Sequence, residues 1–427
     1  MKKILIVSYN FAPRHTVGAI RPTKLAQYLC ESGNEVDVVT VKPYGELDHS
    51  MDRSLEGIGR IDHIDCSIIE DKPAAKKQPS PNTGVAKSKR PSFLRKLKRE
   101  LYEYKKILNS VKFSAAFKSL VKSDLKRFRS YDAVITTYGP VASHLCGLRF
   151  KKLCPGVKWI ADFRDPMVVN TTPPSTVAFR GSVQKKVCKR ADVLVAVSHG
   201  YYDRIFDEEA QKKAHVIYNG FDRGDIDTST IIRDGEFSFT YVGAMHEGMR
   251  DFSPLLELLS ELIREGKIKA QDVNINYAGT SFSVLKNQAE RVGYTGRLTD
   301  HGRVSRGDCL KLQASSRHLL LATWNEKGEN GVFPGKFLEY IMIGRPILSF
   351  VSGEEAGSEV TRVMKRARLG VTYEEACRES DLAVLREYLI SDYEAFLVGR
   401  DADFDPDENE VARFDFANTA KSFEELI

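Results

Sequence analysis

Short apolar stretches rich in β-branched residues alternate with helix-like patterns along the whole chain of 427 residues. This alternation is typical of α/β proteins, in which parallel strands are buried on both faces and helices connect them. The first strands are expected at 3–8 and 35–40, with a helix over 22–31 between them. Further strands of the first half are expected at 133–136, 157–161, 193–196 and 215–218.

The same pattern starts again after residue 236, which predicts a second domain of the same class. The segment 221–236 contains glycines and aspartates without periodicity, and we interpret it as a linker. We therefore expect two doubly wound domains, 1–220 and 237–410, facing a cleft at the carboxyl ends of their sheets, and a C-terminal helix within 411–427 that crosses back to the first domain. The second domain is expected to have strands at 237–242, 273–278, 318–321 and 346–350, a loop at 243–250 and a helix at 253–265.

The composition is that of a folded protein, and we expect it to stay in the cytoplasm. Hydrophobic residues make up 42% and charged residues 29% of the chain, which argues against disorder and against a multi-span membrane protein. No apolar stretch approaches the roughly 18–20 residues of a transmembrane helix. The first strand follows Met1 too closely for a signal peptide. The cysteines and histidines lack metal-ligand spacing, so no metal is expected.

Positive charge is concentrated in one segment of the first domain. Residues 72–129 contain eighteen Lys or Arg and three Asp or Glu, whereas the whole chain has a net charge of +6. Within this segment, 72–91 is predicted to be a loop, and 93–111 has the pattern of a basic amphipathic helix that continues weakly to 128. Three interpretations stay open: a helix on an anionic membrane surface, a nucleic-acid contact, or an ordinary helix whose apolar face joins the core.

Polar residues follow the predicted strands of the first domain. The loop 10–21 joins a strand to a helix, so its backbone N–H groups and Gly18 can face an anion or a sugar. Asp162, Arg164 and Asp165 follow another strand, where they would orient an acceptor hydroxyl or assist its deprotonation, unless they only satisfy one another. The chain has no G-x-G-x-x-G motif, which argues against a dinucleotide-dependent redox enzyme.

Several short segments occur in a distinctive order along the chain. They are KILIVSYNFAP at 3–13 with Gly18 and Arg21, WIADFRDP at 159–166, Ala191-Asp192 to Val197-Ser198, YNG at 218–220, YVG at 241–243, HG at 301–302 and PGKFLEY at 334–340. Together they resemble the retaining glycosyltransferases of family 4. The resemblance covers nearly the whole chain except the basic insertion at about 72–130. It implies a GT-B fold of two Rossmann-like domains, without a cofactor beyond the donor substrate.

The resemblance also assigns roles to residues of the second domain. It implies that the loop from Gly243 through His246 to Arg250, together with Lys336, binds the diphosphate of a nucleotide sugar and stabilises it as it departs. Glu339 is expected to hold the ribose hydroxyls, and the loop with Gly18 is expected to close over the transferred sugar. Further contacts to the nucleotide are expected from Gly279, Thr280, Gly302, Val304 and Gly335.

One position departs from the family pattern. The family usually has an acid eight positions before the glutamate, and this chain has Gly331 there. Glu326, Glu329, Asn330 or backbone N–H groups are the alternatives for contacting the transferred sugar.

These features predict a hexosyltransferase of cell-surface polysaccharide biosynthesis, of the capsule or O-antigen kind. It would move a hexose or N-acetylhexosamine, with retention, from a nucleoside diphosphate sugar, with UDP favoured over GDP, to a lipid-linked or growing glycan. We expect it at the inner face of the plasma membrane, bound to anionic lipid through residues 85–130, without a nucleic-acid partner. The alternatives are a nucleotide-sugar epimerase of the same fold and a non-catalytic nucleotide-binding scaffold subunit.

Overall fold

The computed structural model describes residues 1–66, 93–226, 231–245, 250–328 and 331–427, with backbone alone for 93–96. The predicted loop 72–91, His246, Glu329 and Asn330 lie outside the described residues.

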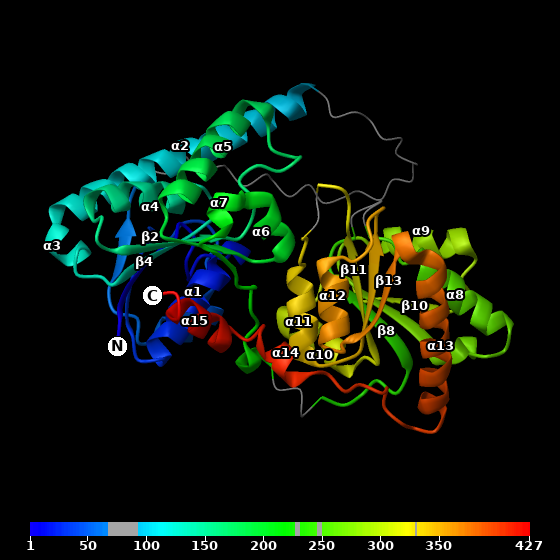
Figure 1. Ribbon diagram of the computed structural model, residues 1–427. Helices are drawn as coiled ribbons and strands as arrows, with labels where there is room; N and C mark the ends of the chain where they lie inside the picture. Colours follow the sequence, from blue (N-terminus) through cyan, green and yellow to red (C-terminus); the bar gives the residue numbers. More distant parts are fainter. Residues whose placement is uncertain (67–92, 227–230, 246–249, 329–330) are drawn as a thin grey trace. The chain divides into compact units, whose positions relative to one another are not determined.

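The chain divides into two compact units (Figure 1). Unit 1 consists of Met1–Val197, Tyr202–Ile217 and Ala420–Ile427, and unit 2 of Ser198–Tyr201 and Tyr218–Thr419. The segment 221–236, interpreted above as a linker, belongs to unit 2. The C-terminal residues of the chain thus return to the unit in which the chain begins.

The described strands of unit 1 form one parallel sheet in the order β3-β2-β1-β4-β5-β6-β7. The central strand β1 pairs with β2 on one side and with β4 on the other, and Ile4, Leu5, Ile6 and Val7 are fully buried. The strand order reverses between β1 and β4, as in doubly wound folds. The strands are β1 Lys3–Val7, β2 Glu35–Val41, β3 Ile61–Ile64, β4 Ala133–Thr137, β5 Lys158–Phe163, β6 Val193–Ala196 and β7 Ala214–Val216.

Helices cover both faces of this sheet (Figure 1). On one face lie α1 (Val17–Glu31) and the C-terminal helix α15 (Phe416–Glu424), whose Phe423 joins the core formed by Ile4 and Ile6. On the other face lie α2 (Phe93–Ser123), α4 (Ala142–Leu153) and α5 (Pro174–Arg190). The shorter helices are η1 His49–Leu55, α3 Leu125–Phe128, α6 His199–Ile205 and α7 Glu208–Gln211.

Unit 2 repeats this architecture with a parallel sheet in the order β10-β9-β8-β11-β12-β13. Helices α8, α9 and α13 pack over Phe237, Phe239 and Tyr241, and α10, α11 and α12 lie on the opposite face (Figure 1). The strands are β8 Phe237–Val242, β9 Val273–Ala278, β10 Arg297–Asp300, β11 His318–Trp324, β12 Ile347–Ser352 and β13 Gly370–Glu374. The helices are η2 Arg223–Asp225, α8 Ser253–Arg264, η3 Ala270–Asp272, α9 Phe282–Val292, α10 Arg306–Ser315, α11 Gly335–Ile343, α12 Glu359–Arg366, η4 Glu375–Cys377, α13 Arg378–Leu397 and α14 Glu408–Ala412.

The two halves of α2 have different surroundings. In the second half, Phe113, Phe117 and Val121 are fully buried, and the helix packs on α4. In the first half, five apolar residues at steps of four and three remain 38–56% exposed: Leu97, Leu101, Tyr104, Leu108 and Val111. The apolar face of the predicted amphipathic helix therefore joins the core in its second half and remains on the surface in its first half.

Two predicted helices differ from the structure, and three strands were not predicted. Helix α1 begins at Val17 rather than at residue 22, because the Thr16 side chain caps it and accepts a hydrogen bond from the Gly18 N–H. The predicted C-terminal helix 413–426 is interrupted, so α14 and α15 are separate helices. Sequence analysis missed β3, β10 and β13, which are edge strands of the two sheets.

Candidate functional site

Both sheets contain a point where the strand order reverses, and such points bind ligands at the carboxyl ends of the strands. In unit 1 this point lies between β1 and β4, and in unit 2 between β8 and β11. Arg164 and Asp165 follow β5 in unit 1, and Gly243 follows β8 in unit 2.

In unit 2, the lysine of α11 lies directly over the loop that follows β8. Gly243 has a φ of +124°, and a Cβ atom there would lie 2.4 Å from Cε and 2.6 Å from Nζ of Lys336. Any other residue would therefore displace the lysine. Burial lowers the pKa of Lys336, Glu339 partly offsets this effect, and the neighbouring Arg250 adds to it. This cation is held in a place that an anion would stabilise.

A second cation is fixed on the same loop. The Arg250 guanidinium donates a hydrogen bond of 2.9 Å to the Tyr241 hydroxyl and another to the Ala244 carbonyl. The backbone carbonyl of Arg250 accepts a hydrogen bond from the Gln288 side chain at 2.9 Å. Arg250 and Lys336 thus come together beside Gly243, where two positive charges fit a phosphate or diphosphate.

The loops after β9 and β10 join the loop after β8. The Tyr277 hydroxyl donates to the Gly243 carbonyl at 2.7 Å, and the Gly279 N–H donates to the Gly302 carbonyl at 2.7 Å. A Cβ atom on Gly279 would lie 2.4 Å from the Gly243 oxygen, so this close approach requires glycine. Thr280 is exposed next to it. The structure thereby brings the predicted glycines Gly243, Gly279 and Gly302 into one contiguous group of loops.

Glu339 lies on α11, one turn after Lys336. Its carboxylate accepts a hydrogen bond from the Gln313 amide at 2.7 Å and pairs with Arg306 at 3.4 Å. A ribose diol would have to replace or share these two donors. Gly335 is the first residue of α11. Val304 lines a separate hollow of unit 2 with His301, Ile232 and Leu312.

The position of the missing acid leaves no room for a side chain. Gly331 has a φ of +85°, and a Cβ atom there would lie 2.5 Å from the Cα atom of Gly200. The Gly331 carbonyl accepts a hydrogen bond of 2.8 Å from the Ser198 hydroxyl, which fixes this approach. Glu326, one of the proposed substitutes, is exposed. In this chain, therefore, close backbone packing requires glycine at the position where the family has an acid.

In unit 1, Asp162 has a structural role, which corrects the prediction that it contacts an acceptor. Its side chain is fully buried, and its two carboxylate oxygens accept hydrogen bonds of 3.0 Å and 2.9 Å from Arg21. Arg21 also donates to the Ile217 carbonyl at 3.0 Å, so the pair connects α1, β5 and the end of β7. We do not retain Asp162 as a catalytic candidate.

Arg164 and Asp165 remain at the carboxyl edge of the sheet. Arg164 donates a hydrogen bond of 2.9 Å to the Gly18 carbonyl, and burial lowers its pKa. Asp165 is accessible to solvent within a concave surface, whose walls raise the pKa of its carboxyl group. A Cβ atom on Gly18 would lie 2.8 Å from the Asn10 amide nitrogen, so Gly18 allows the β1 loop to pack on α1.

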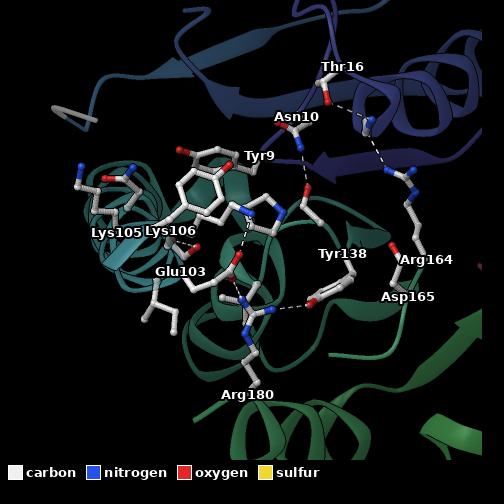
Figure 2. Close-up of a pocket in the computed structure, with 18 of the residues that line it drawn as sticks. Tyr9, Asn10, Thr16, Glu103, Lys105, Lys106, Tyr138, Arg164, Asp165 and Arg180 are labelled. Carbon is white, nitrogen blue, oxygen red and sulfur yellow. Dashed lines mark hydrogen bonds and ion pairs between the residues drawn. The ribbon is translucent and has the colours of Figure 1, made fainter. Parts of the chain in front are cut away.

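These residues border a cavity of about 680 Å³ in unit 1 (Figure 2). Its walls come from the loops after β1, β2, β4 and β5 and from helices α2 and α5. Sequence analysis missed most of the lining, including Arg14, Tyr44, Tyr138 and Arg180. Arg14 in the β1 loop and Tyr138 directly after β4 follow predicted strands, so the strand pattern could have identified them. Nothing in the sequence indicates that α2 or α5 lies at the carboxyl edge of the sheet.

Two features are absent from the described residues. Within the part of the chain that the structure describes, no three His, Cys, Asp or Glu side chains are grouped so that they could hold a metal ion. No helix in the same residues combines the length and apolarity that crossing a bilayer requires.

The comparisons with known proteins establish the fold. No protein-family model and no curated protein sequence matches this chain. The lipopolysaccharide outer core galactosyltransferase WaaB, in its apo form, is 15% identical with a TM-score of 0.56, over 99% of this chain and 98% of that one. The apo structure of OtsA is 9% identical with a TM-score of 0.57, over 99% of both chains. A structure described as trehalose-6-phosphate from E. coli bound with UDP-2-fluoro glucose is 11% identical with a TM-score of 0.55, over 99% of this chain and 98% of that one.

At these identities the likeness concerns the fold. Together with the two doubly wound sheets, it confirms the predicted GT-B fold of two Rossmann-like domains. Membership in family 4 and the roles of the individual residues remain predictions.

The buried ion pair leads to the first testable prediction. Asp162→Asn should reduce the free energy of unfolding by about 3–5 kcal/mol, because it leaves the Arg21 guanidinium buried without its counter-charge. The measurement is urea-induced unfolding of the full chain. Asp65→Asn is the matched control, since the Lys42–Asp65 pair is exposed and should contribute about 0–1 kcal/mol. A variant of unchanged stability that loses only its activity would return Asp162 to the reaction.

Proposed function

We propose that this protein is a glycosyltransferase that uses a nucleoside diphosphate sugar. The observation that carries the proposal is the convergence of Lys336 and Arg250 beside Gly243, at the reversal point of the unit 2 sheet. Two cations on a glycine loop suit a diphosphate, and a GT-B fold with such a site suits the departure of a nucleoside diphosphate from a sugar.

The chemistry follows from charge that develops as the glycosidic bond breaks. Negative charge grows on the departing diphosphate, and Lys336 and Arg250 stabilise it more strongly in the transition state than in the bound donor. Glu339 would hold the ribose by exchanging its present donors, Gln313 and Arg306, for the ribose hydroxyls. Retention of configuration and a phosphate oxygen as proton acceptor are part of the proposal. A UDP-sugar carrying a hexose or N-acetylhexosamine is the proposed donor.

The acceptor side of the proposal lies in unit 1. Asp165 and Arg164 border the cavity at the carboxyl edge of its sheet, where the hydroxyl of a glycan would be received. Here Asp165 would accept a hydrogen bond from the attacking hydroxyl, and the raised pKa of its carboxyl group suits a hydrogen-bonding partner within a poorly hydrated wall.

We further propose that the first half of α2 binds an anionic membrane surface, where a lipid-linked glycan would be found. Its exposed apolar residues form one stripe, and Lys98, Lys105 and Lys112 each follow a member of that stripe. An apolar stripe flanked by cations is complementary to a surface of acyl chains and anionic head groups. This arrangement supports a peripheral protein of the inner leaflet in polysaccharide biosynthesis.

Nucleotide binding tests the donor site. At about 100 times its dissociation constant, a ligand that binds only the folded state adds roughly 2.7 kcal/mol of stability, so UDP should raise the thermal midpoint more than GDP, ADP or dTDP. Lys336→Gln should weaken UDP binding by about tenfold or more, since a charge-assisted hydrogen bond is lost. Lys327→Gln, an exposed lysine of the same unit, is the control. The proposal is rejected if none of the four nucleotides binds.

Vesicle binding tests the stripe on α2. Leu101→Ser should weaken binding to vesicles that contain phosphatidylglycerol by about tenfold or more, because a Leu side chain contributes roughly 1.5–3 kcal/mol when it leaves water. Leu397→Ser is a matched control, since Leu397 is 54% exposed in unit 2 and Leu101 is 56% exposed. Sedimentation at low and high salt measures the effect, and high salt should weaken binding of the unaltered protein. Equal loss in both variants, or none in either, would contradict membrane binding through α2.

A further inference from the structure

The unit 1 cavity has a lining that indicates which acceptor it takes. All of its lining residues belong to unit 1, and its volume of about 680 Å³ lies within the range of small-molecule sites. One wall is formed by Tyr102 to Ser110 of α2, on the side of the helix away from the exposed stripe. The opposite walls are the loops after β1, β4 and β5 (Figure 2).

Positive charge exceeds negative charge in this lining. Five basic side chains line the cavity, against two acidic ones, Glu103 and Asp165. Glu103 is already neutralised, because it pairs with Arg180 and with Lys106. The cavity walls reduce the hydration of Asp165 and raise the pKa of its carboxyl group, an effect that the neighbouring Arg164 opposes.

Two of the arginines have no carboxylate partner among the residues that the structure describes. Arg14 donates to the Asn10 side chain at 2.5 Å and stacks 3.9 Å from the centre of the Tyr44 ring. Arg164 donates to the backbone carbonyls of Gly18 and Val17. Both guanidinium groups thus make their direct contacts with neutral groups. Asp165 and Asp162 attract Arg164 without forming a direct ion pair with it, so both guanidinium groups can still contact a ligand.

The wall also contains buried hydrogen-bond donors without an acceptor. In the described part of the chain, the buried Nε atoms of Arg14, Arg164 and Arg180 have no hydrogen-bond partner. Burial raises the pKa of Tyr138 to about 12 and raises that of Tyr9, so both hydroxyl groups stay protonated and can donate. A ligand rich in acceptors, such as a phosphate or a carboxylate, would satisfy such a wall.

Aromatic rings complete the lining. Tyr9, Tyr44, Tyr102 and Tyr138 line the cavity with aromatic ring faces and polar hydroxyl groups, although Arg14 covers one face of Tyr44 and Lys106 covers one face of Tyr102. Such faces suit the C–H groups of a sugar ring, and the hydroxyl groups suit its oxygens. The combination of tyrosines with unpaired guanidinium groups indicates a sugar that carries an anion.

We propose that the unit 1 cavity binds the acceptor through an anionic group next to a sugar ring, with Arg14 and Arg164 contacting the anion. This inference rests on the proposed function and names its acceptor class. The anion has two sources with shared chemistry: the phosphate or diphosphate that links a sugar to a lipid, or the carboxylate of a uronic acid within a glycan. Because α2 has the cavity on one side and the exposed stripe on another, the first source would also bring the acceptor to the lipid surface.

The test is calorimetric titration of the full chain with three probes: glucose 1-phosphate, glucuronate and glucose. At least one anionic probe should bind about tenfold or more tightly than glucose, because charge-assisted hydrogen bonds are the stronger ones. Tighter binding of glucose 1-phosphate identifies a phosphate-linked acceptor, and tighter binding of glucuronate identifies an acidic glycan. Equal affinity for all three probes, or no binding, overturns the proposal.

Substitutions in the cavity lining test whether the anionic probe binds in unit 1. Arg14→Gln should weaken binding of the anionic probe by about tenfold and leave its affinity for glucose unchanged. Arg53→Gln, an exposed arginine of the same unit, should have no effect. Lys105→Gln is a second test of probe binding, because it alters the α2 wall of the cavity and leaves the β1 loop unchanged. Lys118→Gln, on the same helix and outside the cavity lining, is its control.

A titration of UDP separates this proposal from the proposed function. If UDP binds and the anionic probe does not, the acceptor class is wrong and the donor site stands. If the anionic probe binds and none of UDP, GDP, ADP and dTDP does, the cavity stands and the transferase proposal fails. If Lys336→Gln removes binding of the anionic probe and Arg14→Gln does not, the probe occupies unit 2 and the acceptor proposal is overturned.

Discussion

Parallel strand pairing is the constraint on which the rest of this structure depends. When every strand of a sheet runs in one direction, all of its carboxyl ends meet at one edge, and the loops that follow must share that edge. In unit 2, this pairing brings Gly243, Gly279 and Gly302 together, although they follow three different strands. In unit 1, it brings the loops after β1, β4 and β5 around one cavity.

Unpaired positive charge distinguishes the candidate sites from the structural charges of the two units. Arg21 and Asp162 satisfy each other in the core, and Arg317 pairs in the same way with Asp392 in unit 2, where its partners lower the pKa of Asp392 to about 2 despite burial. Among the described residues, Arg14, Arg164, Arg250 and Lys336 at the two sheet edges form no direct ion pair with a carboxylate. Burial and the neighbouring Arg250 lower the pKa of Lys336, and an anionic ligand would oppose that effect.

Hydrophobic patterning in the sequence was sufficient to predict the fold. The same patterning predicted only part of the residues at the two candidate sites. Strands inside the sheets such as β6 and β8 were predicted to the residue. β6 is an uninterrupted apolar run, and β8 alternates aromatic residues with Ser238 and Thr240 before Val242. Edge strands such as β3 were missed, since Asp62 and His63 interrupt the run. The buried pair of Asp162 could not be foreseen, because Arg21 lies far away in the sequence and long-range ion pairs leave no local pattern. For the same reason the cavity wall formed by α2 was not anticipated.

The central claim is that Gly243, Lys336 and Arg250 bind the diphosphate of a nucleotide sugar. Hydrogen–deuterium exchange of the full chain, with and without saturating UDP, tests it most directly, because amides that contact or border a ligand exchange more slowly. The account predicts slower exchange at the loop after β8 and at the start of α11, with little change in α15. Unchanged exchange at both of those segments, at a UDP concentration that saturates binding, would contradict it.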